Sequence, residues 1–197
     1  MARRVPKGQQ TREQILATAL ELFAAHGFQA VTVEQIAADA GVTKGAVYHW
    51  FADKDDIGRE LQHQLNERLS ARAAAAFEPG GDLVDNLTRA FGAWLDALGD
   101  HDEARFFLRD AWVIPVLDEA GRSDHEASVE LASGVLQAAI DRGEIVALDA
   151  HVLARALIGA WAELTLHVLR TGDRQAALDV VHRLTSALRT DPPGAPT

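Results

Sequence analysis

Hydrogen-bond donors are concentrated in one short stretch of the chain, residues 32–54. They are hydroxyls, ammonium groups, a phenol and an imidazole, carried by Thr32, Thr43, Lys44, Tyr48, His49 and Lys54. Groups of these kinds bind phosphate oxygens and base edges in nucleic acids. General acid–base catalysis instead relies on positioned histidines or carboxylates, and no such pair at helical spacing stands out in this chain. The stretch therefore indicates nucleic-acid binding.

Other kinds of site have little support in the sequence. The chain has eight histidines, but no two are four residues apart and no His-Glu-x-x-His segment occurs, so we expect no metal site. Cysteine is absent, which excludes disulfides, thiol nucleophiles and cysteine-ligated zinc. We find no glycine-rich phosphate loop and no G-x-S-x-G segment. The sequence therefore predicts neither an enzyme nor a bound cofactor.

Three short helices are expected to position the donors, over residues 11–27, 32–40 and 43–51. Thr11 and Thr32 each precede a glutamine by three residues, which is the spacing of a capping box at a helix start. The last two helices are joined by a turn that contains a glycine. This order predicts a helix-turn-helix, whose third helix is short enough to lie in the major groove of DNA.

The rest of the chain is expected to form six helices, and no strand pattern is visible. Their expected ranges are 54–77, 82–99, 102–117, 123–143, 149–172 and 173–189. Asp53 is expected to cap the first of them. Pro115 should kink the third or end it at Ile114, and Ser123 with Glu126 has the capping-box spacing of the next helix start.

The predicted fold class is all α, with a three-helix helix-turn-helix head on a six-helix body. The expected domains are a basic arm over residues 1–10, the DNA-binding head over 11–53, the body over 54–190 and a disordered tail over 191–197.

Charge is distributed unevenly between these parts. The 197 residues carry a formal net charge of −10, with 48% hydrophobic and 24% charged residues, a composition typical of globular proteins. Residues 1–52 hold five bases and four acids, so the remaining residues carry a net −11. A polyanionic partner should therefore meet the N-terminal end. No run approaches 18 consecutive apolar residues and no signal peptide is recognisable, so we expect no membrane association and a cytoplasmic location.

Residues 23–57 resemble the DNA-binding domain of the tetracycline-repressor (TetR) family of bacterial regulators. The resemblance rests on Phe23-x3-Gly27-Phe28, on Ile36-Ala37-x2-Ala40-Gly41-Val42-Thr43-Lys44-Gly45-Ala46-Val47-Tyr48-His49-Trp50-Phe51, and on Lys54 and Ile57. It implies that Thr43, Lys44, Gly45 and Ala46 face bases or nearby phosphates. It also implies that Thr32, Tyr48 and Lys54 bind the DNA backbone. We predict His49 as a further DNA contact. Trp50 departs from the usual His or Tyr of the family and is given no role.

The last two helices are expected to form a subunit interface as well as part of the core. The 149–172 helix is apolar nearly all round, so it must be covered on more than one side. The 173–189 helix carries an apolar seam. The predicted interface residues of the homodimer are Trp161, Leu164, Val168, Ala177, Val181, Leu184 and Leu188.

The resemblance also implies an effector pocket among the body helices. Apolar walls with a few polar groups suit such a pocket. The candidates are Phe91, Trp94, Phe107, Arg109, Trp112, Trp161 and Thr165, and ordinary core packing is the alternative for each. Because the body is acidic, we expect a neutral or cationic, largely apolar effector.

The predicted function is that of a ligand-responsive transcriptional regulator, a repressor that binds a pseudo-palindromic double-stranded DNA operator as a dimer. A small-molecule effector of unknown identity would release it. One alternative is a helical enzyme or carrier that holds a cofactor in the bundle. Another is a DNA-binding regulator controlled by a protein partner.

Overall fold

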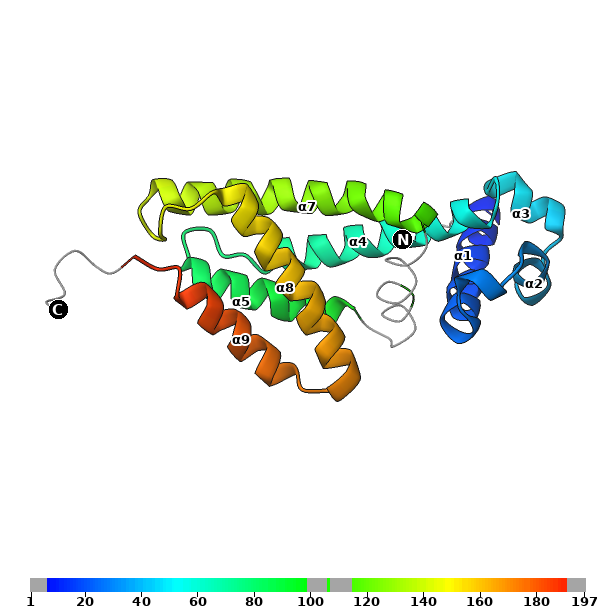
Figure 1. Ribbon diagram of the computed structural model, residues 1–197. Coiled ribbons are helices and arrows are strands. Elements are labelled where there is room, and N and C mark those ends of the chain that lie inside the picture. The colour runs from blue at the N-terminus through cyan, green and yellow to red at the C-terminus, as the bar shows by residue number, and fades with distance from the viewer. Residues whose placement is uncertain (1–6, 99–105, 107–114, 191–197) are drawn as a thin grey trace, which may run out of the picture. The chain divides into compact units, whose positions relative to one another are not determined.

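The computed structural model describes residues 7–98, 106 and 115–190 (Figure 1). The chain divides into two compact units. Residues 1–66 with 100–122 form the first unit, and residues 67–99 with 123–197 form the second. Within the described residues the fold is all α, and the only extended pairing is an isolated bridge between Ile145 and Arg189.

The first unit is built from short helices that begin at polar caps. Thr32 caps α2 with a full capping box: its Oγ1 accepts from the N–H of Gln35 (3.3 Å), and the Gln35 side chain accepts from the N–H of Thr32 (2.8 Å). Thr43 caps α3 by accepting from the N–H of Ala46 (3.1 Å). The elements are α1 (Lys7–His26), the 3-10 helix η1 (Phe28–Ala30), α2 (Val33–Asp39), α3 (Lys44–Trp50) and the start of α4 (Lys54–Ala75).

The core of the first unit includes a ring from a distant part of the chain. Phe23 of α1 packs against Phe28, with ring centroids 4.8 Å apart. Phe106 also stacks on Phe23, with ring centroids 5.5 Å apart, and is fully buried. Val47 is the buried residue of α3 in the same cluster. The head is therefore completed by a residue that follows it by more than 50 positions in sequence.

The second unit contains α5 (Leu83–Ala97), α8 (Ala150–Thr171), α9 (Arg174–Ser186) and the part of α7 (Pro115–Asp141) that follows residue 122. α9 packs against α5 and α8 (Figure 1). Aspartates cap three of these helices, at the starts expected from the sequence: the side chains of Asp82, Asp149 and Asp173 each accept from a backbone N–H in the first turn. Gly172 ends α8 with a φ of 75°, a backbone conformation that favours glycine.

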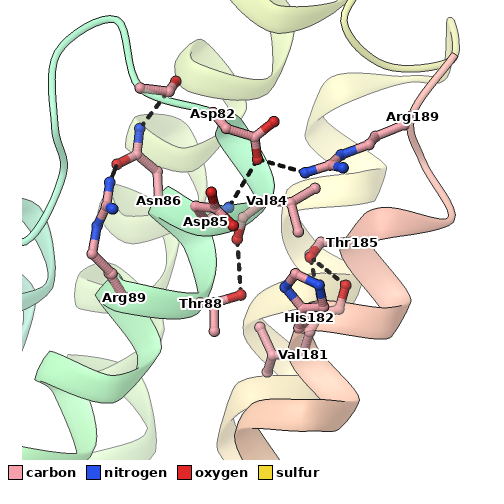
Figure 2. A network of polar contacts seen from close by, with 11 residues as sticks. Asp82, Val84, Asp85, Asn86, Thr88, Arg89, Val181, His182, Thr185 and Arg189 are labelled. Atoms are coloured by element: carbon pink, nitrogen blue, oxygen red, sulfur yellow. Dashed lines mark hydrogen bonds and ion pairs between the residues drawn. The ribbon is translucent and has the colours of Figure 1, made fainter.

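A polar network connects the start of α5 to Arg189, which follows α9 (Figure 2). Asn86 is only 4% exposed, and its side chain binds both the N–H and the carbonyl of Glu78 at 2.8 and 3.0 Å. Arg189 forms an ion pair with Asp82 at 2.7 Å. Thr190 donates from its backbone N–H to Glu144 (3.2 Å). Arg189 and Thr190 thus connect the start of α5 to the loop between α7 and α8.

Two helix starts differ from the sequence prediction. α1 begins at Lys7 rather than near Thr11, because helix-compatible residues precede Thr11 and Gly8 packs against the Trp50 ring. α7 begins at Pro115 and continues through Ser123, so the expected helix start at Ser123 is wrong, whereas the expected helix end at Ile114 lies outside the described residues. Proline is well tolerated in the first turn of a helix, where its missing N–H has no intrahelical acceptor. The helix expected over 102–117 otherwise lies outside the described residues, except for Phe106.

α8 is the most apolar of the described helices. By length and composition alone it could cross a membrane, a criterion that single core helices of soluble proteins also meet. Most of its side chains are only partly covered within this chain, and Val152 is 63% exposed. An apolar helix with so little cover in the protomer is suited to packing against a further surface.

Candidate nucleic-acid interface

The recognition helix α3 is anchored on one side and exposed on the other. Val47 is buried in the head core, whereas Tyr48 is 48% exposed and His49 is also exposed. Thr43 and Lys44 are exposed at the start of the helix. We call the exposed residues Glu34, Thr43, Lys44, Tyr48 and His49 of α2 and α3 the DNA face.

The turn between α2 and α3 fixes the angle of α3. Gly41 has a φ of 66°, a left-handed conformation that a side chain would strain, and the N–H of Val42 donates to the carbonyl of Ala37 (3.0 Å). The Gln14 amide of α1 donates to the carbonyl of Ala40 (2.9 Å). The end of α2 is therefore held by both neighbouring helices, which sets the direction in which α3 presents its side chains.

Lys44 is already paired within the protein. Its ammonium forms an ion pair with Glu34 of α2 and lies 5.6 Å from the centre of the Tyr48 ring. The hydrogen bond from Lys44 holds the pKa of Glu34 below its usual range, and the hydrogen bond to Glu34 raises the pKa of Lys44. Both groups are therefore charged at neutral pH, and they offset each other on the DNA face. Glu34 is not among the predicted site residues, because its pairing partner is ten positions away.

The predicted small residues of α3 leave the start of the helix open. A Cβ at Gly45 would meet only the Thr43 Oγ1, at 3.9 Å, which is an ordinary contact. The N–H of Ala46 is used by the Thr43 cap. Packing within the protein does not require Gly45 to be small, so the surface beside it is available to a partner.

Lys54 turns inward toward the loop that precedes α2. Its ammonium donates to the carbonyls of Phe28 (2.8 Å) and Gln29 (3.4 Å) and lies 4.6 Å from the centre of the Phe28 ring. These contacts give Lys54 a positioning role at the start of α4. Its expected contact with a DNA phosphate stays a prediction, as do the contacts of the other seven predicted residues.

Two further side chains brace the head without having been predicted. Arg12 of α1 forms an ion pair with Glu60 of α4 at 2.6 Å and lies 5.4 Å from the centre of the Phe51 ring. Trp50, left without a role from the sequence, lies edge-on to His49 and against Gly8 of α1. The contacts of Arg12, and that of Trp50 with Gly8, join residues far apart in the chain, which a local sequence pattern does not reveal.

The described effector-pocket candidates form a compact aromatic cluster in the second unit. Phe91 is fully buried, and the Trp161 ring lies 5.2 Å from it and 6.5 Å from the Trp94 ring. The hydroxyl of the buried Thr165 donates to the Trp161 carbonyl (2.7 Å) and is therefore satisfied within α8. The remaining candidates, Phe107, Arg109 and Trp112, lie outside the residues whose side chains the structure describes.

The predicted interface residues divide into three groups by exposure. Ala177 and Val181 are 1% and 2% exposed and pack with Phe91 inside the protomer. Their expected place in an interface is corrected: the buried side of α9 faces its own core. Leu184 is 51% exposed, and Val180, one turn earlier in α9, is 41% exposed. The other four are partly buried: Trp161, Leu164 and Val168 against the Phe91 cluster, and Leu188 against a second cluster.

In the part of the chain that the structure describes, no group of three or more His, Asp or Glu side chains could hold a metal ion.

Comparisons with known proteins cover both units. Residues 15–61 match the bacterial regulatory proteins of the tetR family, and residues 84–190 match the tetracyclin repressor-like C-terminal domain. The HTH-type transcriptional regulator SrpR of Pseudomonas putida is 30% identical over 187 residues, which cover 90% of this chain and 84% of that protein. The HTH-type transcriptional repressor KstR2 of Mycobacterium tuberculosis is 32% identical over 111 residues, 56% of this chain and 52% of its own length.

Solved structures share the fold. The fatty acid degradation regulator FadR from Bacillus halodurans superposes with a TM-score of 0.77 at 21% identity, covering 93% of this chain and 96% of that one. The capped helix-turn-helix, the matched segments and the relative that spans most of the chain agree with one another. This protein therefore belongs to the TetR family of bacterial transcriptional regulators, which are DNA-binding proteins and not enzymes.

Proposed function

We propose that this protein represses transcription as a homodimer on a pseudo-palindromic operator and leaves the DNA when a small molecule binds the body. The observation that carries the proposal is the geometry of α3. Val47 anchors this helix in the head core while Lys44, Tyr48 and His49 are exposed on its other side. Repression is named for the relative KstR2, and we extend it to this chain.

Selection of duplexes from a random-sequence pool tests the DNA-binding part. We expect the wild-type chain to enrich a pseudo-palindrome with half-sites about one helical turn apart, roughly 34–36 Å, because a two-fold dimer presents two recognition helices. Lys44→Ala should then weaken binding to the selected duplex by about 1–3 kcal/mol if Lys44 contacts a base. A pool from which no sequence is enriched would remove the proposal.

The dimer is proposed to form through the outer faces of α8 and α9. Val152, Val180 and Leu184 are exposed apolar residues on these two helices, and α8 has little cover within the protomer. Burying such side chains against a second copy would remove apolar surface from water, which is the main driving force for obligate association. Ala177 and Val181 are left out of this surface because they belong to the protomer's own core.

Two exposed leucines provide a matched test of the dimer. Leu184→Glu should give a folded monomer in sedimentation equilibrium, because the new carboxylate is solvated in the monomer and unpaired in the interface. Leu131 of α7 is 63% exposed, so Leu131→Glu makes the same change on another helix and should leave the dimer intact. If both variants remain dimeric, the interface lies elsewhere.

The effector is proposed to bind near the aromatic cluster of Phe91, Trp94 and Trp161. Tryptophan faces attract cations within about 6 Å, and the acidic body favours the approach of neutral or cationic molecules. Residues 54–66 of α4 belong to the first unit and residues 67–75 to the second, so one continuous helix connects the two units. A movement of α4 caused by ligand binding in the second unit would therefore reach the first. A ligand that binds one dimer geometry better than the other would then shift the population away from DNA.

Tryptophan fluorescence tests the effector part. In a Trp50→Phe, Trp112→Phe variant the remaining tryptophans, at 94 and 161, both belong to the second unit and to the aromatic cluster, so quenching reports on that cluster. Apolar compounds of cationic, neutral and anionic classes are titrated with and without the selected duplex. Binding and DNA release by anionic compounds alone would overturn the proposed effector class. Quenching by none of the classes would favour control by a protein partner, which the close packing of the cluster also allows.

A further inference from the structure

The DNA face carries almost no positive charge for a surface that binds a polyanion. Lys44 is the only lysine or arginine between Gly27 and Asp53 in the sequence. In the structure its ammonium is paired with the carboxylate of Glu34, and both side chains are exposed. The charge that could bind any phosphate is therefore offset on the protein itself.

The pairing also fixes where the ammonium lies. Glu34 is in the first turn of α2, which the Thr32 capping box and the Gln14 bond to Ala40 hold in place. The Lys44 ammonium also lies 5.6 Å from the centre of the Tyr48 ring, one turn further along α3. An ammonium group has three N–H donors, so the bond to Glu34 leaves two for a base edge. The lysine is thus held in one place before any DNA arrives.

We propose that Glu34 is a specificity-determining residue of the DNA face, which holds Lys44 for a base contact and cancels its charge toward non-specific phosphates. This inference rests on the proposed DNA contact of Lys44. On DNA of any sequence, the neutral pair gains little from phosphate binding, because moving the ammonium to a phosphate only exchanges one anion for another. On the operator, the held ammonium donates its remaining N–H groups to base acceptors without leaving Glu34.

Removing the charge of Glu34 should therefore strengthen non-specific binding to DNA phosphates. Each phosphate that a protein neutralises contributes about 0.9 to the slope of log affinity against log salt concentration. One additional uncompensated ammonium therefore corresponds to roughly a fivefold gain in non-specific affinity at 0.15 M salt, taking 1 M salt as the reference. We expect the operator affinity to change less than twofold, because the added attraction is offset by the loss of orientation.

The experiment compares two duplexes: the one selected from a random pool by the wild-type chain, and a scrambled duplex of the same length and composition. Affinities are measured for wild type and for Glu34→Gln over a range of salt concentrations. We expect the variant to bind the scrambled duplex about five times more tightly, with a salt slope steeper by about 0.9, and to lose about fivefold in discrimination. An unchanged or improved discrimination would overturn the inference.

Two controls separate the paired charge from charge in general. Asp39→Asn removes one negative charge from the same helix, and the described contacts include no ion pair of Asp39; it should leave the discrimination unchanged. In a Lys44→Gln background, Glu34→Gln should no longer alter the discrimination. If either control changes it as much as Glu34→Gln does in the wild type, the pair is not responsible. If the wild-type chain itself fails to discriminate, the proposed function fails first and the inference with it.

Discussion

Replacing Lys54 by methionine separates two roles that one lysine could have in the head. The resemblance to the family implies a phosphate contact, whereas the structure shows the ammonium bound to the carbonyls of Phe28 and Gln29 and lying over the Phe28 ring. Methionine keeps most of the aliphatic length and removes the charge and the donors. If the observed contacts are the main role, the variant should lose stability in the absence of DNA.

The size of the loss follows from these contacts. A hydrogen bond from a charged donor contributes about 1.5–3 kcal/mol, and a cation–π contact at an exposed site about 0.5–1 kcal/mol. Lys54 is half-buried and the second carbonyl is distant, so the lower ends apply and the sum is about 2 kcal/mol. For a chain of this length that corresponds to a fall in Tm of about 4–8 °C.

Lys44→Met is the matched comparison, since Lys44 also pairs with a carboxylate and an aromatic ring but is exposed. Exposed ion pairs contribute little, so its Tm should change by about 2 °C or less. Its salt slope on the selected duplex should change little, because Glu34 offsets its charge and it is proposed to contact a base and not a phosphate. A phosphate contact of Lys54 would make the slope of Lys54→Met shallower by about 1, whereas a positioning role leaves that slope unchanged. Differential scanning calorimetry and mobility-shift titrations provide the two readings. An unchanged Tm for Lys54→Met, with a shallower salt slope, would refute the positioning role.

Three further outcomes are expected. Asn86→Ala should destabilise the second unit by about 2 kcal/mol in urea unfolding, because the backbone N–H and carbonyl of Glu78 lose their side-chain partner; Thr88→Ala, which removes only an intrahelical bond, should cost much less. Phe106→Ala should cost about 3–5 kcal/mol in the head core and reduce the folded fraction seen by circular dichroism. The N–H of Asp85 foremost, and also Arg189, lower the pKa of Asp82. The stabilisation from this carboxylate is thus present above its unfolded pKa and lost as the pH falls below about 4. The free energy of unfolding of Asp82→Asn should therefore depend less on pH in that window than that of the wild type. Equal dependence would contradict the assigned contacts.

Signals that act within a few residues predicted most of the elements. The side chains of Thr32, Thr43 and Asp82 each accept from a backbone N–H three residues later, a contact that the sequence alone contains. Glycine after the last helical turn likewise marks the end of α8. Pro115 could not be assigned in the same way, because proline is compatible both with the end of one helix and with the first turn of the next.

The candidate site was less predictable than the helices that carry it. The residue types of α3 identify the DNA face, but the partners of Lys44 and Lys54 lie 10 and about 26 positions away and depend on how the helices pack. The apolar seam of α9 shows that this helix is covered, and not which neighbour covers it. For this reason Val181 was assigned to a subunit interface although it packs against Phe91 of the same chain.

The contacts of Arg189 and Thr190 also determine which unit can fold first during translation. The described core of the first unit is complete once Phe106 has emerged from the ribosome, whereas the second unit needs Arg189 and Thr190 to reach Asp82 and Glu144. At a translation rate of about 5–20 residues per second, roughly 4–17 s separate these two points. We therefore expect the first unit, which carries the DNA face, to fold first during translation. A chain truncated before Arg189 would contain a folded head without a completed second unit to control it.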